Sequence, residues 1–159
     1  MAAAGKWKLY DFAKKYLGDG TFDMDNASLG MQTALFLSTS NCDTLSVGTG
    51  VYGDLTNEVA NGLGYTTGGI VDTGEVWTRS GGTITYDCDN TIWTAAGGSI
   101  VARFAVKYIN ATVNSIVKPL LCVSLLDTAP ADKTATDGNT FTVAIHGSGV
   151  FTLSGADSN

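Results

Sequence analysis

The chain has 159 residues, of which 44% are hydrophobic and 15% charged, with a formal net charge of -6. This composition suits one folded domain and excludes a disordered chain, because disorder needs low hydrophobicity and high charge. The nine basic residues are scattered, so the local positive potential of a nucleic-acid binder is not expected. We expect threonine, serine, asparagine and glycine to supply much of the polar surface, as in chains that work packed against neighbours.

A short amphipathic helix is predicted over residues 6–17, because the apolar residues of this stretch fall mostly on one face. Lys14 and Lys15 lie in its last turn, where they complement the helix dipole, and Gly18 is a natural end. A helix this short must dock on its own domain or on a neighbouring subunit. We therefore divide the chain into an N-terminal arm (1–18), a single domain (19–155) and a C-terminal tail (156–159).

Short strands separated by glycine-rich turns are predicted for the rest of the chain. The stretch 41–53 is expected to be a long excursion, 55–59 a helical turn or an extended piece, and 61–69 too rich in glycine for regular structure. The fold class is therefore mainly β: an antiparallel β-sandwich or barrel, jelly-roll-like, with one short N-terminal helix. The expected strands are 32–38, 70–78, 83–88, 92–95, 99–109, 120–126, 141–146 and 149–153.

The three cysteines, Cys42, Cys88 and Cys122, are an odd number without a Cys-x-x-C pair, which argues against a disulfide framework and a zinc site. We expect three small buried apolar thiols. The N-terminus lacks the apolar stretch of a signal peptide, and no run reaches transmembrane length. The chain is expected to be made in a cytosol, reduced and soluble, without a membrane partner.

His146 is the single histidine, so a Ser-His-Asp or Cys-His mechanism would have to use it. It could act as a general base with one of the cysteines as nucleophile, or be a polar residue at a strand end. No nucleophile signature surrounds any cysteine, and no Gly-x-Ser-x-Gly motif is present. We therefore assign no catalytic residue and expect a protein that is not an enzyme.

Two acidic clusters are the other candidates for chemistry: Asp19, Asp23 and Asp25, and then Asp87 and Asp89 with Asn90. They could serve a glycosidase, with Trp77 and Trp93 framing a cleft, or hold calcium outside an EF-hand. The simpler interpretations are aspartates that bond the local backbone in turns and tryptophans that pack in the core. The glycine pattern lacks the lysine and following helix of a phosphate loop, so no cofactor or metal is expected.

Several motifs of glycine and threonine turns follow one another in a fixed order. They lie at 17–23, 57–59, 62–69, 81–84, 92–95, 100–106, 119–120 and 137–143, and so are spread over most of the chain. In this order they resemble a widespread type of small tailed-bacteriophage virion protein.

This resemblance implies a structural role in the virion, most specifically as a head decoration (cement) protein. A tail or head-tail component is the first alternative. The implied partners are the major capsid protein or other virion proteins, with a homotrimer or another homo-oligomer of the chain itself, assembled in the host cytoplasm. The resemblance implies no catalytic residues.

The N-terminal segment is our candidate partner-binding site, because aromatic anchors beside basic residues suit docking onto an acidic shell. The alternative is that these aromatics close the bottom of the sandwich. A tail-tip glycan- or receptor-binding module belongs to a different class, and would expose Trp77 or Trp93 instead. The candidate partner-binding residues are Trp7, Lys8, Tyr10, Lys14 and Tyr16.

Overall fold

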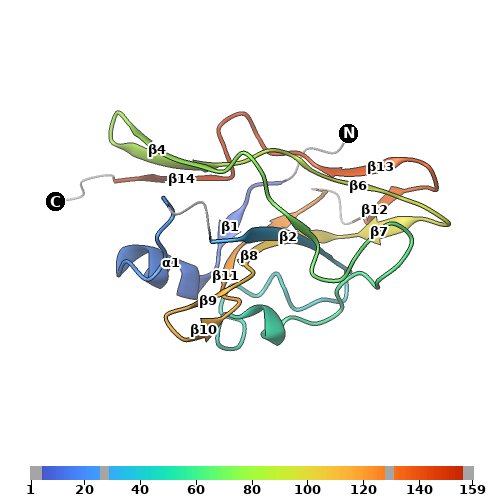
Figure 1. Ribbon diagram of the computed structural model, residues 1–159, viewed down its shortest axis with the longest axis horizontal. Coiled ribbons are helices and arrows are strands. Elements are labelled where there is room, and N and C mark those ends of the chain that lie inside the picture. Colours follow the sequence, from blue (N-terminus) through green and yellow to red (C-terminus); the bar gives the residue numbers. More distant parts are fainter. Residues whose placement is uncertain (1–4, 26–28, 128–130, 156–159) are drawn as a thin grey trace.

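Two antiparallel layers of strands pack face to face in the computed structural model, which describes residues 5–25, 29–127 and 131–155 (Figure 1). The predicted mainly β, sandwich-like fold is confirmed, and the described strands do not close into a barrel. The central layer has the strand order β1-β11-β8-β2-β3. Its strands are β1 (Lys8–Leu9), β11 (Leu120–Leu125), β8 (Phe104–Ile109), β2 (Met31–Phe36) and β3 (Ile70–Val71), extended by the pair β7 (Ile100–Ala102) and β12 (Lys133–Ala135).

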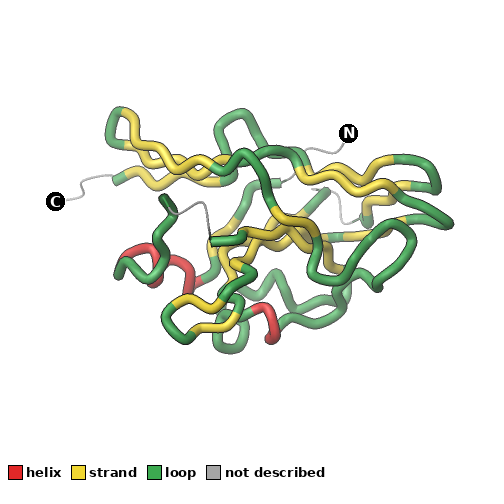
Figure 2. The backbone as a smooth tube through the Cα atoms, viewed as in Figure 1, coloured by secondary structure: helices red, strands yellow, loops and turns green. Residues whose placement is uncertain are grey.

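The outer layer lies above the central layer in Figure 1. It contains a three-stranded sheet of order β14-β5-β4 and the pair β13-β6, which continues the same layer. Below the central layer lie a helix, a small hairpin and a long loop (Figures 1 and 2). The outer strands are β4 (Val76–Ser80), β5 (Thr83–Asp87), β6 (Thr91–Thr94), β13 (Thr140–Val143) and β14 (Phe151–Ser154).

The strand β8 lies at the centre of the sandwich, and all six of its residues are buried. It pairs with β11 on one side and with β2 on the other, in antiparallel register. A strand covered on both faces reads as a continuous apolar run instead of an alternating one. This explains why the stretch Phe104–Ile109 is the strongest strand signal in the sequence.

The N-terminal segment differs from the prediction. The helix α1 (Asp11–Gly18) begins five residues later than expected, and Lys8 and Leu9 instead pair with Val123 and Cys122 as β1. This edge of β11 offers peptide groups that an extended segment can pair with, and Asp11 places an acidic side chain in the first helical turn. The described part of residues 1–18 is therefore built into the domain and is not a separate arm. The predicted tail, 156–159, lies outside the described residues.

Two predicted strands are divided in the structure. The stretch 70–78 breaks between β3 and β4, where residues 72–75 cross from the central to the outer layer. The stretch 99–109 breaks at Arg103, whose backbone N–H donates to Phe36 and whose carbonyl accepts from Leu126. The strand β4 continues to Ser80, two residues beyond the predicted end at 78, so the turn before β5 consists of Gly81 and Gly82, both with positive φ.

The long excursion between β2 and β3 is confirmed as irregular chain with one 3-10 turn, η1 (Tyr52–Asp54). Residues 55–59 form no helical turn: Leu55 is extended and Glu58 forms an isolated bridge with Phe36, while Asn57 between them has a positive φ. Besides β1, three short strands were not predicted: β12 and the hairpin of β9 (Thr112–Val113) with β10 (Ile116–Val117). Each has only two or three residues, too few for alternation to be recognised.

Candidate interaction surface

A buried ion pair joins the two layers at the point where the chain crosses between them. The Lys107 ammonium on β8 lies 2.6 Å from a carboxylate oxygen of Asp72, and both side chains are 0% exposed. Lys107 also donates to the Thr33 hydroxyl at 2.8 Å, and Thr33 donates to Asp72 at 2.6 Å. The Thr91 hydroxyl adds a further bond to Asp72 at 3.2 Å. A pair bonded in this way is satisfied without water, so its role is structural.

Burial is the largest influence on Lys107 and lowers its pKa, but the charge and hydrogen bond of Asp72 together with the nearby thiols Cys88 and Cys122 outweigh it, so the net pKa is raised. The Trp7 ring covers the ammonium at 5.3 Å from its centroid. The sequence does carry a signal for this buried pair, in the position of Lys107. A lysine inside the apolar run of β8 needs a buried counter-charge.

The three cysteines are buried free thiols, as predicted. Burial raises the pKa of Cys88 to about 11 and that of Cys42 to about 12, and it also raises the pKa of Cys122. A nucleophilic cysteine needs a lowered pKa and access to substrate. These thiols therefore act as small apolar side chains at neutral pH.

His146 is exposed in the loop between β13 and β14, a few residues beyond the strand end where it was expected. Its Nδ1 atom accepts a hydrogen bond from the Ser148 backbone N–H at 3.1 Å. In the described residues no hydrogen bond or ion pair joins His146 to a thiol or a carboxylate. This geometry fits a local turn contact.

The first acidic cluster bonds to its own turn through Asp19, whereas Asp89 of the second bonds to Thr73 in the segment that crosses between the layers. Asp19 pairs with Lys15 at 2.7 Å and accepts from the Thr21 backbone, and these hydrogen bonds lower the pKa of Asp19. Asp89 accepts from the Thr73 hydroxyl at 2.9 Å. Within the described ranges, no three His, Cys, Asp or Glu side chains gather closely enough to hold a metal ion.

The two tryptophans that could frame a cleft have different environments. Trp93 is 2% exposed and packs against Tyr65 and Phe141, which is the predicted core role. Trp77 is half-buried and lines a cleft of about 230 Å³ between β4 and the chain that leads into β2. This acidic cleft is also lined by Glu75 and Asp25, without a basic residue among its described lining.

The Glu75 carboxyl of the acidic cleft has a raised pKa. Partial burial is the main cause, and the negative charge of Asp72 adds to it, although a hydrogen bond from the Tyr86 hydroxyl at 3.3 Å opposes the shift. A half-buried carboxylate with a nearby like charge favours a cationic partner. A second cleft, of about 380 Å³, lies between β12 and β13 and is lined by Leu126 and Phe141 with threonines.

The outward side of the outer layer is nearly uncharged. The strand registers place twelve side chains on this side, of which nine are threonine or serine, and Asp87 is the only charged one. We call this surface the hydroxyl face. Its hydroxyl residues are Thr78, Ser80, Thr83, Thr85, Thr94, Thr140, Thr142, Thr152 and Ser154, and Val76, Ile92 and Asp87 complete it.

The N-terminal residues predicted to bind a partner are divided between core and surface. Tyr10 is fully buried and its hydroxyl donates to the Cys42 carbonyl at 2.6 Å, so it serves the core. Trp7 is partly buried and packs against both hydrophobic clusters. Tyr16 is half-buried beside Phe22, as the alternative interpretation expected for these aromatics.

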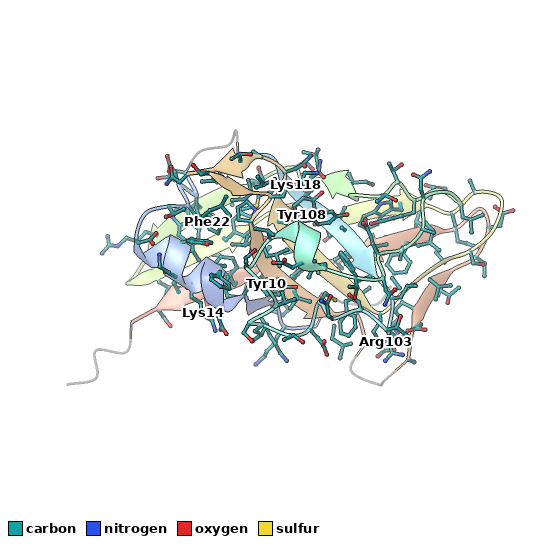
Figure 3. The ribbon with its side chains drawn as sticks, turned by 90° about the horizontal axis from the view of Figure 1, so that it is seen from below. Tyr10, Lys14, Phe22, Arg103, Tyr108 and Lys118 are labelled. Atoms are coloured by element: carbon teal, nitrogen blue, oxygen red, sulfur yellow. The ribbon has the colours of Figure 1, made fainter. Side chains whose placement is uncertain are left out.

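The basic residues of this segment remain on the surface. Lys8 is exposed on β1, and Lys14 is exposed on α1 and paired with Asp11 at 2.9 Å. Figure 3 shows Tyr10 and Lys14 beside each other at α1, with Tyr108 and Lys118 near η1. Arg103 lies at the end of the molecule opposite α1. Docking through Lys8, Lys14 and Tyr16 stays a prediction.

The comparisons with known proteins found no matching family model, no similar curated protein and no similar solved structure. Among the described residues, no helix has the length and apolar character needed to cross a membrane.

Proposed function

We propose that this chain is a structural protein of a tailed-bacteriophage virion, most specifically a capsid decoration (cement) protein that bridges and stabilises major capsid subunits. A tail or head-tail component is the alternative within the same particle. The proposal rests on the order of glycine-threonine motifs in the sequence, and one structural observation supports it: the hydroxyl face. Twelve outward side chains of the outer layer include a single charge.

This composition suits a surface that is covered in an assembly. Burying a charge costs far more than burying a hydroxyl that finds a hydrogen-bond partner, so the cores of protein interfaces are depleted in charged residues. Each contact made by a small protein is weak, but a protein that touches several shell subunits gains affinity once the first contact has formed. A hydroxyl face used in this way would lock neighbouring subunits together.

The test compares virions that contain and lack the protein. We expect particles without it to assemble but to burst at a lower temperature or a milder osmotic shock. Unchanged particle stability would contradict a cement role. Quantified gel bands then separate the alternatives, because a decoration protein is present in many copies over the head whereas a tail or head-tail ring has six or twelve.

A substitution in the hydroxyl face tests the surface itself. Thr85→Lys places a charge between Thr78 and Thr152, in the middle of the three-stranded sheet. We expect this variant to bind virions that lack the protein more weakly than the unmodified chain does. Thr112→Lys on β9, an exposed position outside the hydroxyl face, is the matched control and should bind normally.

Glycan binding is a second candidate function, favoured by the half-buried Trp77 beside two carboxylates in an open cleft. A tryptophan face and acidic groups are suited to a sugar ring. Specific retention on a glycan array that is lost in a folded Trp77→Ala variant would support this function over the structural one.

A further inference from the structure

The strand β4 is a free edge of the outer layer. It pairs with β5 on one side and with no described strand on the other. Four of its five residues are exposed, and Val76 is 47% exposed. A free edge is a template for pairing with another strand, and proteins usually protect it with proline, lysine or a bulge. The sequence of β4, Val-Trp-Thr-Arg-Ser, contains no proline and its ladder with β5 is regular. Its one charge, Arg79, lies on the inner side of the strand, where it opposes pairing unless the arriving partner supplies a counter-charge.

The charges around this edge are complementary when β4 is paired with itself. In an antiparallel pair of two β4 strands centred on Thr78, Trp77 of each copy lies directly opposite Arg79 of the other. Both residues lie on the inner side of the strand, because their partners on β5 are Tyr86 and Ile84. An arginine opposite a tryptophan can stack on its ring, twice in such a dimer.

The acidic cleft supplies the counter-charge for the arriving arginine. It opens beside Trp77 and contains Glu75 and Asp25, so a guanidinium that stacks on Trp77 meets two carboxylates. Within one copy Arg79 is exposed and has neither an ion pair nor a hydrogen bond among the described residues. The other edge strand of the sheet, β14, carries no charged residue and so favours no register.

We propose that the partner of the β4 edge is a second copy of this chain, joined by a two-fold antiparallel β4–β4 pair in which Arg79 of each copy enters the acidic cleft of the other. The two strands are short, so the contact buries less than a stable isolated interface needs. The dimer is therefore concentration-dependent in solution and gains strength where copies are held close together. This inference concerns the purified chain and does not rest on its place in a particle.

The test uses the two-fold register, which brings Thr78 of one copy opposite Thr78 of the other. Thr78→Lys and Thr78→Glu each place two like charges face to face, so each variant alone should dimerise roughly fivefold more weakly. Mixed together, the two variants should pair again, as a heterodimer. A size tag on one variant gives the mixed dimer its own mass, so that sedimentation velocity distinguishes it. Thr152→Lys on β14 adds the same charge away from β4 and is the control, which should dimerise like the unmodified chain.

The arginine is tested separately. Arg79→Ala should weaken the dimer and Arg79→Lys should retain part of it, while Glu75→Gln should weaken the dimer without unfolding the chain. A chain that stays monomeric at all concentrations overturns the proposal. So does an oligomer that the single Thr78 variants leave unchanged, or one that the mixture fails to restore, because another surface then forms it.

Discussion

At the scale of single residues, the pair of Lys107 and Asp72 is costly to disturb because it is a fully buried ion pair. Removing one partner leaves an uncompensated charge in the interior, at a cost of about 3–5 kcal/mol, whereas removing both can be nearly neutral. We therefore expect Asp72→Asn and Lys107→Met each to lower the free energy of unfolding by about that amount. The double variant should recover part of the loss. Urea denaturation measures all three, and a single-variant cost below about 1 kcal/mol would show that water reaches the pair.

The buried cysteines predict how stability depends on alkaline pH. Their folded pKa values are raised, to about 11 for Cys88 and about 12 for Cys42, from a reference value of 9.0. The folded chain thus holds its thiol protons while the unfolded chain loses them, so stability falls as the pH rises above about 9. The slope adds up to about 1.4 kcal/mol per pH unit for each such group.

Denaturation midpoints measured between pH 8 and pH 10 check this expectation. Raised tyrosine pKa values, such as that of Tyr108 at about 12, and the raised pKa of Lys107 act in the same direction at higher pH. Cys88→Ala is the informative variant, because it should flatten the slope just above pH 9 while keeping the fold. A midpoint that does not change over this range would mean that the thiols ionise inside the folded chain.

At the scale of elements, the long loop between β2 and β3 depends on the carboxylate of Glu58. One oxygen accepts from the Tyr65 hydroxyl and from the Gly68 backbone, both at 2.6 Å, and the other accepts from the Tyr52 hydroxyl. Tyr52 in turn stacks on Tyr108 of β8, with ring centroids 4.4 Å apart. The Glu58 carboxylate therefore gathers three donors of the loop at one point, beside backbone bonds such as that from Val59 N–H to the Leu35 carbonyl.

We expect Glu58→Ala to cost about 2–3 kcal/mol, because three donors lose a charged acceptor. Hydrogen exchange should show the loss locally, in residues 52–68, before the strands of the central layer are affected. Thr66→Ala, at an exposed position of the same loop, is the control. Uniform loss of protection over the whole chain would contradict the view that this loop opens on its own.

The long strands and the glycine turns could be predicted from the sequence because their signals are local. The apolar run of β8 and the Gly81–Gly82 turn are examples. The strand β1 could not be predicted in this way. Residues 8 and 9 are extended because they pair with the edge of β11, which lies more than a hundred residues away in the sequence. The acidic cleft was missed for the same reason: Trp77 and Glu75 meet Asp25 only through the packing of β4.

At the scale of the whole molecule, the sandwich is completed by its N-terminal segment. Tyr10 and Ala13 are fully buried in the same cluster as Leu121 and Cys122, and the Tyr10 backbone N–H donates to Leu121. The sequence pattern left open whether this segment docks on a partner or closes its own sandwich, because the alternation of apolar and basic residues is the same whichever surface it covers. The structure shows that the apolar side of this segment covers its own domain.

Deletion of residues 1–18 should therefore remove the cooperative folding of the chain. Truncating a buried aromatic side chain such as Tyr10 alone costs about 3–5 kcal/mol, and a domain of this size has about 5–15 kcal/mol in total. We expect the deleted chain to lose its near-ultraviolet circular dichroism and to bind a hydrophobic dye.

The free energy of unfolding of the double variant Lys8→Ala/Lys14→Ala should lie within about 0.5 kcal/mol of that of the original chain, because both lysines lie on the surface. This variant therefore isolates the docking role of the segment from its folding role: weaker binding to particles with an unchanged unfolding midpoint would assign the two lysines to the shell contact. A truncated chain that keeps a sharp transition at the original midpoint would instead show that residues 1–18 are a removable arm.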